Sequence, residues 1–335
     1  MLGVSGSFIL KKNTLNKRQK SYDSKYILKS INNKTISIKS LKLNIVNNNF
    51  YEISKDNIYI LCCGEIYDTE KKNVVEFIHN KFKLTGIENL NKLNGNYLII
   101  IYDIKKEELH VVTDENNIIP FFYHKSSSDF IFSWDISLLT KQVASLSYNY
   151  ENLMSWLLVG GRSFFNTTRF QNIHRLEPGE IITIKNSCIH NIKAKYFCFE
   201  PSSSSMSNLV DDAADALIKA FHKRINKKKH YFLGLSGGLD SRILIGAMKK
   251  SKINLRNFTT YTYGIENFQE NIIAKEVSKY IKIKHLFINV DHNSYRKFAN
   301  DGLFVSSGNS IFKLGVFTHL FQNLSLNHTN SSIIL

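Results

Sequence analysis

The sequence predicts two domains in tandem, an α+β layered domain followed by an α/β domain with a doubly wound parallel sheet. Residues 1–199 contain short runs of Ile, Val, Tyr and Phe separated by Asn, Asp, Gly and Lys, a pattern typical of hairpins. Residues 208–335 alternate short apolar strands with amphipathic helices, which indicates a parallel sheet with right-handed crossovers. Residues 200–207 contain a proline and a run of four serines, a composition typical of a linker.

Length and composition are those of a globular protein. The 335 residues suffice for two ordinary domains, and only three prolines interrupt the chain. The net charge of +16 has two interpretations, a polyanionic partner or a lysine-rich background. Most of the lysines are scattered among Asn, Ile and Tyr, and the run at 227–229 is typical of a solvated turn. We therefore expect no nucleic-acid partner.

No apolar run approaches the roughly 18 residues that a membrane helix needs, so we expect a soluble, cytoplasmic protein without a membrane partner. The four cysteines form no C-x-x-C pair. If Cys62 and Cys63 lie on a strand, they point to opposite faces of it. Neither a disulfide framework nor a zinc site is expected.

The expected elements follow from the spacing of apolar residues. In the first domain we expect strands at 8–10, 58–63, 97–102, 109–113, 130–134 and 181–184, helices over 71–83 and about 150–159, and a turn over 176–180. In the second domain we expect helices over 210–223, 241–249 and 270–280, and strands at 231–235, 258–263, 283–290 and 331–335.

Residues 236–241, with the sequence Ser-Gly-Gly-Leu-Asp-Ser, connect the strand that ends at Leu235 to the next helix, and Leu235 is itself counted among the residues expected to line an ATP and pyrophosphate site. Open α/β sheets bind ligands at this end of a strand. Gly237 and Gly238 would allow backbone conformations closed to other residues and a close approach by phosphate oxygens. The N–H groups at the start of the helix add partial positive charge. The alternative is a structural turn, but a phosphate cradle is favoured.

Ser236 and Ser241 can donate hydroxyl hydrogen bonds to a phosphate. A carboxylate at Asp240 repels bare phosphate, so its predicted role is to hold Mg²⁺ or to fix the shape of the loop. Thr260 and Gly264 lie towards the end of the following strand and are expected to border an adenine through their backbone. Three further residues have both a functional and a structural interpretation. Arg242 could reach phosphate or pair with a surface acid, Glu270 could act at the site or simply stabilise the start of a helix, and His285 could belong to the site or be a buried structural histidine.

Residues 236–241 are similar to the SGGxDS loop of the ATP-pyrophosphatase superfamily. The first domain resembles the class II glutamine amidotransferase domain of glutamine-hydrolysing asparagine synthetases. Its motifs appear in the family's order along nearly the whole chain. They are Met1–Gly6 (M-C-G-I-x-G), Gly64–Asp68 (N-G-E-I-Y-N), Leu93–Asp103 (L-x-G-x-F-A-F-x-x-Y-D), Asp114 with Ile119–Tyr123 (R-D-x-x-G-x-x-P-L-Y-Y) and Leu176–Gly179 (L-P-P-G).

The resemblance implies an Ntn-hydrolase-like domain followed by an incomplete adenine-nucleotide α-hydrolase-like domain. It implies ATP and Mg²⁺ as ligands, and adenylation of a carboxylate with release of pyrophosphate. The activated carboxylate would pass to an amine acceptor. The substrates would be aspartate or another small molecule or peptide.

Three positions depart from the family's glutaminase site. Leu2 stands where the family has its nucleophilic cysteine. Cys63, Gly64 and Glu65 stand where the family has Asn-Gly-Glu, so a thiol replaces the oxyanion-binding amide. There is no arginine between Arg18 and Arg162 to hold the substrate carboxylate. We therefore expect no glutaminase activity and no catalytic residue in this domain. Relatives without the cysteine include β-lactam synthetases and lasso-peptide cyclases, which join an internal amine to the activated carboxylate. An intramolecular amide ligase of this kind is therefore the alternative to asparagine synthesis.

The strand expected at 331–335 resembles the one that precedes the family's Gly-Asp-Glu loop, which has no counterpart in this sequence. We consider a fragment, a truncated gene product, a non-catalytic remnant and half of a split enzyme as alternatives. A partner chain that completes the second domain is therefore one expected partner, and a second copy of this chain is another.

Overall fold

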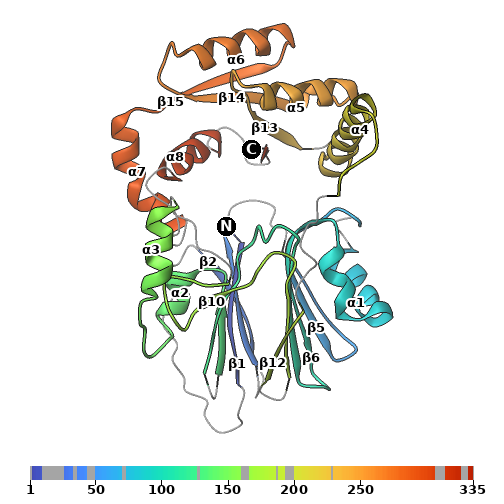
Figure 1. The fold of residues 1–335 in the computed structure, drawn as a ribbon, viewed down its shortest axis with the longest axis vertical. Coiled ribbons are helices and arrows are strands. Elements are labelled where there is room, and N and C mark those ends of the chain that lie inside the picture. The colour runs from blue at the N-terminus through green and yellow to red at the C-terminus, as the bar shows by residue number, and fades with distance from the viewer. Residues whose placement is uncertain are drawn as a thin grey trace. The chain divides into compact units, whose positions relative to one another are not determined.

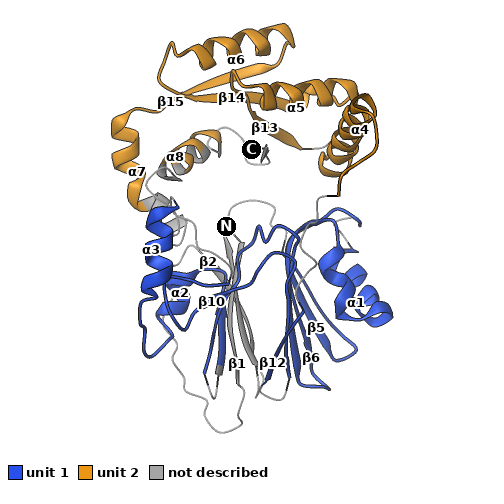
Figure 2. Ribbon diagram, viewed as in Figure 1, with its two compact units in different colours: residues 1–197 blue, residues 198–335 orange. Residues whose placement is uncertain are grey.

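A computed structural model describes residues 2–9, 26–32, 36–43, 50–69, 73–126, 129–159, 166–185, 188–192, 200–227, 229–305, 314–325 and 331–334. The chain divides into two compact units, residues 1–197 and residues 198–335 (Figure 2). Among the described residues, no helix combines the length and the apolarity that crossing a membrane requires.

The first unit contains two antiparallel sheets of six strands each (Figure 1). One sheet has the order β10-β8-β9-β1-β3-β2 and the other has the order β12-β11-β7-β6-β5-β4. The strands of the first sheet are β1 (Leu2–Ile9), β2 (Tyr26–Asn32), β3 (Ile36–Leu43), β8 (Phe122–Lys125), β9 (Asp129–Ser133) and β10 (His174–Arg175). Those of the second are β4 (Phe50–Lys55), β5 (Ile58–Ile66), β6 (Gly95–Asp103), β7 (Glu108–Thr113), β11 (Ile181–Lys185) and β12 (Cys188–Ile192).

The two sheets pack face to face through a shared apolar core that includes Leu61, Ile100, Phe121 and Phe132. Three helices are described in this unit: α1 (Val74–Thr85), α2 (Ile136–Thr140) and α3 (Tyr150–Leu158). Helix α1 covers the outer face of the second sheet, and α2 packs on the outer face of the first. The layers are therefore helix, sheet, sheet, helix, which is the predicted α+β Ntn-hydrolase-like arrangement.

Adjacent cysteines on β5 show how period-two alternation fills this sandwich. Cys63 faces the core between the sheets, and Cys62 faces the core under α1. The prediction that they point to opposite faces is confirmed. Neither forms a disulfide. Cys198 lies outside the described residues.

The second unit is built on a parallel sheet in the order β15-β14-β13-β16, with every neighbouring pair parallel. Its strands are β13 (His230–Gly234), β14 (Phe258–Gly264), β15 (Lys284–Asn289) and β16 (Ser331–Ile334). Its helices are α4 (Met206–Arg224), α5 (Leu239–Lys250), α6 (Gln269–Tyr280), α7 (His292–Val305) and α8 (Leu314–Ser325). Helices α4, α5 and α6 pack on one face of the sheet and α8 on the other. The predicted doubly wound sheet is confirmed.

Some elements differ from the expected bounds. Helix α4 begins at Met206, inside the segment expected as a linker, because the Ser205 hydroxyl accepts the Asn208 N–H at 3.3 Å as an N-cap. Helices α7 and α8 were not predicted. The spacing of Val316, Leu320 and Leu324, which are all buried, is nevertheless the helical signal that could have revealed α8.

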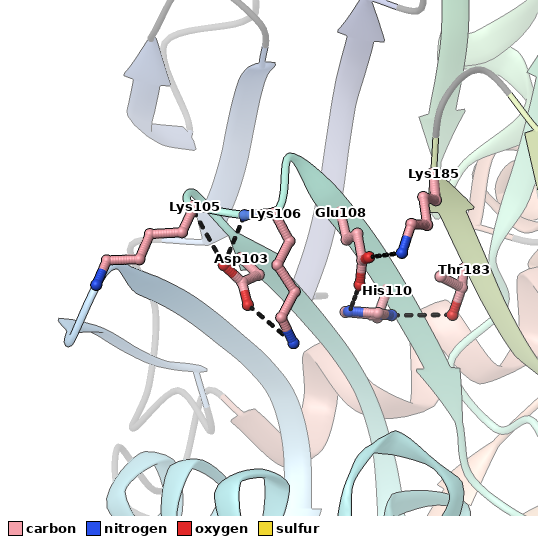
Figure 3. A network of polar contacts seen from close by, with 7 residues as sticks. All are labelled: Asp103, Lys105, Lys106, Glu108, His110, Thr183 and Lys185. Carbon is pink, nitrogen blue, oxygen red and sulfur yellow. Dashed lines mark hydrogen bonds and ion pairs between the residues drawn. The ribbon is translucent and has the colours of Figure 1, made fainter.

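A buried polar network ties β7 to β11 in the first unit (Figure 3). Lys185 Nζ lies 2.6 Å from Glu108 Oε1, and His110 Nε2 lies 3.7 Å from Glu108 Oε2. The other ring nitrogen of His110 is 2.9 Å from the Thr183 hydroxyl. Burial lowers the pKa of His110 to about 4, although the Glu108 and Asp103 carboxylates act in the opposite direction. His110 is therefore neutral in the folded protein near neutral pH.

We predict that the first unit loses stability as pH falls from 6.5 to about 4, the ordinary and the folded-state pKa of His110. The unfolded chain binds a proton at His110 over this range and the folded chain does not, so the loss stops below the folded-state pKa. The size is roughly 3 kcal/mol, at about 1.4 kcal/mol per pKa unit. Urea unfolding is measured by fluorescence of Trp134 and Trp156, the only two tryptophans of the chain. His110→Gln should flatten the profile in this range, and parallel profiles for the two proteins would contradict the assignment.

Candidate nucleotide-binding loop and the degenerate glutamine site

The candidate nucleotide-binding loop, residues 236–241, begins where β13 ends. Leu235 is buried, its N–H donates to the Tyr261 carbonyl at 2.8 Å, and its carbonyl accepts the Thr262 hydroxyl. Strand β14 therefore holds Leu235 through both its N–H and its carbonyl group. Because β14 lies on one side of β13 and β16 on the other, the loop starts at the switch point of the sheet.

Two serine hydroxyls set the shape of the loop. Ser241 Oγ accepts the Ser236 N–H at 3.1 Å and lies 3.2 Å from Ser236 Oγ. Ser236 Oγ in turn accepts the Gly238 N–H at 3.1 Å. The loop is thus closed on itself by its own first and last residues, and it needs no ligand to take this form.

The expectation that the two glycines adopt backbone conformations closed to other residues was wrong. Neither has a positive φ, and Gly238 has φ −72° and ψ 161°, which any residue can adopt. The constraint on Gly237 is space, because a Cβ there would lie 3.1 Å from the Glu270 Cα and 3.3 Å from the Ile273 side chain. Helix α6 packs directly against the loop, and this contact brings Glu270 to the candidate site.

Helix α5 starts at the loop without a side-chain cap, since its N-cap residue is Gly238. The N–H groups of its first turn are therefore open to an anion. Arg242 does not extend towards a ligand, because its Nε donates to the Gly238 carbonyl at 3.1 Å. This arrangement suits the phosphates of ATP, which would be held mainly by backbone groups.

Asp240 is exposed in the first turn of α5. No group of three His, Cys, Asp or Glu side chains that could hold a metal occurs among the described residues. Mg²⁺ in nucleotide sites commonly takes only one or two carboxylates and otherwise binds phosphate and water oxygens. Asp240 fits Mg²⁺ in that limited sense, as a single protein ligand.

Thr260 and Gly264, the two residues expected to border an adenine, differ in where they lie on β14: Thr260 is within the strand and Gly264 is at its end. Gly264 ends β14, and its carbonyl accepts the Val290 N–H at 2.9 Å. Thr260 lies inside the strand opposite Leu233 and is fully buried. Its hydroxyl is 3.0 Å from His285 Nδ1 and donates to the Lys284 carbonyl at 3.2 Å, so Thr260 and His285 link β14 to β15. The residue of β14 beside the loop is Thr262, which sequence reasoning missed because cross-strand register decides it.

The Cys63 thiol, at the position predicted to belong to a degenerate glutamine site, is completely buried, and burial raises its pKa well above the ordinary value. Its surroundings are the apolar side chains between the two sheets. It is therefore a core residue that favours the neutral thiol, and neither an exposed nucleophile nor an oxyanion donor. Leu2 lies on β1.

Gly64 follows Cys63 at an unusually close contact between β5 and β6. Its φ is +104°, and a Cβ would lie 2.0 Å from the Asn96 carbonyl oxygen. The approach is mutual, since a Cβ at Gly95 would lie 2.2 Å from the Glu65 carbonyl oxygen. Only glycine fits at these positions, so the close approach of β5 and β6 explains both residues.

Comparison with known protein families matches both halves of the chain. Residues 54–197 match the family described as glutamine amidotransferase domain, and residues 212–297 match the family described as asparagine synthase. The chain belongs to the asparagine synthetase family.

Two relatives in this family show the extent of the likeness. The putative asparagine synthetase [glutamine-hydrolyzing] 2 of Methanocaldococcus jannaschii is 24% identical over 251 residues, covering 70% of this chain and 48% of that protein. Asparagine synthetase [glutamine-hydrolyzing] 2 of Bacillus subtilis is 24% identical over 245 residues, covering 65% of this chain and 32% of that protein. The chain thus spans half or less of the length of these relatives.

Among solved structures, the glutamine phosphoribosylpyrophosphate amidotransferase from B. subtilis, complexed with ADP and GMP, is 12% identical with a TM-score of 0.28. The likeness covers 76% of this chain and 51% of that one.

One asparagine synthetase motif residue, Asp114, organises the domain from within. Its buried carboxylate accepts the N–H groups of Asn116 at 2.8 Å, Tyr97 at 3.1 Å and Ile118 at 3.2 Å. Its carbonyl accepts the Gly179 N–H at 2.8 Å, which ties it to the predicted turn at 176–180. Burial raises the pKa of Asp114, against the effect of these N–H groups. The motif aspartate therefore has a structural role here.

We predict that Gly64→Ala costs at least about 2 kcal/mol more unfolding free energy than Gly86→Ala. Gly86 is a matched control, because it also has a positive φ, of 73°, but no atom lies within 4 Å of the added methyl. Both variants bear the strain of a positive φ, and only Gly64→Ala adds the clash with Asn96. Urea unfolding followed by tryptophan fluorescence tests this, and equal losses in the two variants would refute the close approach.

Proposed function

We propose that this protein is an ATP-dependent amide-forming ligase of the asparagine synthetase kind that adenylates a carboxylate and has no glutaminase of its own. The observation that carries the proposal is the self-closed loop at the switch point, with the uncapped start of α5 behind it. Because the chain spans only part of its relatives, its activity is proposed from its own residues.

In the proposed reaction a substrate carboxylate oxygen attacks the α-phosphorus of ATP. The bond from that phosphorus to its bridging oxygen breaks, and pyrophosphate leaves. An amine nitrogen then attacks the acyl carbon, AMP leaves with the electron pair of the C–O bond, and the nitrogen loses a proton. Charge builds on the leaving pyrophosphate, so groups that bind it stabilise the transition state.

The chain supplies those groups at the loop. The N–H groups of the first turn of α5 would face the phosphates, Gly237 lets α6 pack against the loop, and the Ser236 and Ser241 hydroxyls keep the loop in shape. Bound Mg²⁺ would neutralise part of the phosphate charge, with Asp240 as its protein ligand. Gly264, at the end of β14, is the residue proposed to border the adenine.

Three features of the sequence support the proposed absence of glutaminase activity. Leu2 has no nucleophilic atom, Cys63 is a buried neutral thiol, and no arginine lies between Arg18 and Arg162. The amine must then come from free ammonia or from an amine-bearing substrate. Leu2 also favours a second candidate, an intramolecular amide ligase like β-lactam synthetase or the lasso-peptide cyclases, in which one substrate carries both groups.

We predict carboxylate-dependent exchange of labelled pyrophosphate into ATP, with aspartate as the first carboxylate to test. Gly237→Val should abolish exchange and ATP binding, because its side chain meets α6 at the loop. Gly246→Ala is the control, because Gly246 lies in α5 with nothing within 4 Å of the added methyl, and it should change neither. A thermal melt shows that each variant is folded.

Three outcomes separate the alternatives. Exchange that needs a substrate with both a carboxylate and an amine supports the intramolecular ligase. ATP binding without exchange, until a candidate partner chain is added, identifies one part of a split enzyme. Absence of both binding and exchange, with and without such partners, would leave a non-catalytic remnant and refute the proposal.

We predict that purified protein releases no glutamate from glutamine, and that Leu2→Cys alone does not restore release. The variant supplies a thiol, but Cys63 still replaces the amide donor and the carboxylate-binding arginine is still missing. A coupled glutamate assay measures this. Release by the unmodified chain would refute the proposed loss of glutaminase activity, without bearing on adenylation.

A further inference from the structure

The edge of the second unit opposite the loop is strongly and uniformly basic. The connections at residues 222–230, 248–258 and 278–284 all reach the amino ends of the strands, and together they contain twelve lysines and arginines but no aspartate or glutamate. At the carboxyl edge the acids Asp240, Glu266, Glu270 and Asp291 follow the strands. The positive charge is therefore concentrated at one edge of the sheet.

A pocket of about 250 Å³ lies within this basic edge. Its cationic side chains are Arg256, Lys282 and Lys284, and none of them has an ion-pair partner among the described residues. His230 and Thr259 form a polar wall, with His230 Nε2 2.9 Å from the Thr259 hydroxyl. The floor is apolar and is formed by Leu255, Phe258 and Ile283.

The solvated-turn interpretation accounts for lysines near helix ends, because cations there offset the partial negative charge of helix carbonyls. It does not account for their number. Each helix end contributes about half a negative charge, so three helices offset at most about one or two of the twelve cations. A large positive excess remains at this edge.

The end of α6 places Lys282 at the pocket through a tight turn. Helix α6 ends in a Schellman motif, with the Lys282 N–H donating to the Lys279 carbonyl at 3.2 Å and the Ile283 N–H donating to the Ser278 carbonyl at 3.1 Å. Lys282 occupies the left-handed position of this motif with φ 58°, where glycine is the usual residue. Lys252, outside the pocket, holds the same position at the end of α5 with φ 54°, so this backbone conformation is shared by two lysines of the basic edge and does not by itself point to a ligand.

We propose that this pocket binds a small organic phosphate, with its phosphate held by Arg256, Lys282 and Lys284 and its carbon body on Leu255, Phe258 and Ile283. The volume is below the roughly 300–1,000 Å³ of sites for drug-sized ligands, which favours a small molecule over a large one. The site lies about 20 Å from the loop, since Ser236 follows His230 by six positions of extended chain. It is therefore distinct from the proposed ATP site.

The test uses phenyl phosphate, which joins a phosphate monoester to an apolar ring, and follows its binding to the full chain by equilibrium dialysis. Lys282→Ala with Lys284→Ala should weaken binding by at least about tenfold, because two charged donors are lost. Lys219→Ala with Lys275→Ala is the matched control. It removes the same charge from exposed positions of α4 and α6 outside the basic edge and the pocket, and it should change the affinity by less than about twofold.

Gly237→Val separates the two sites, because it should block the loop and leave phenyl phosphate binding intact. Inorganic phosphate should bind more weakly than phenyl phosphate, since it cannot use the apolar floor. The proposal is overturned if the two lysine pairs weaken binding equally, if Gly237→Val abolishes it, or if phenyl phosphate does not bind. Binding of single-stranded RNA through Lys282 and Lys284, without binding of phenyl phosphate, would replace the pocket by a polyanion surface. Thermal melts confirm that each variant is folded.

Discussion

The end of β13 is held by two contacts from the neighbouring strand, and the geometry of the candidate nucleotide site depends on them. The Leu235 N–H donates to the Tyr261 carbonyl, and the Leu235 carbonyl accepts the Thr262 hydroxyl. Because these two hydrogen bonds hold Leu235, they fix the position of Ser236, where the loop begins. The loop then closes through the Ser241 hydroxyl, which accepts the Ser236 N–H. The start of α5 is then aimed by the sheet rather than by a flexible connection. Such pre-organisation means that little ordering entropy is lost when a phosphate binds.

The first unit shows which parts of a motif belong to the fold and which to the chemistry. Gly64 and Gly95 allow the backbones of β5 and β6 to approach closely, and the Asp114 carboxylate accepts backbone N–H groups. The sequence retains all three of these motif residues. The residues that would act on glutamine have no such structural duty. Cys63 fits the core between the two sheets, because a buried thiol among apolar side chains behaves as a small hydrophobic side chain.

Features set by local spacing could be predicted from the sequence. The strand, loop and helix around residues 231–249 follow from apolar periodicity, as do the opposite faces of Cys62 and Cys63. Features set by contacts across the fold could not. The reason for Gly237 depends on Glu270, which is distant in sequence, and the positions of Thr260 and Thr262 depend on the register between strands. The basic edge was visible only as net charge until the topology brought its three segments together.

The separation of charge along the strands has a kinetic consequence for any nucleotide that approaches the second unit. The formal charges favour the approach of an anion to the amino edge, whereas the loop at the carboxyl edge offers mainly partial charges on N–H groups. Partial charges act at short range, and full charges act over about a Debye length. Added salt should therefore slow arrival at the amino edge much more than arrival at the loop. Raising the ionic strength would therefore increase the share of nucleotides that reach the loop first, without changing any contact within the loop.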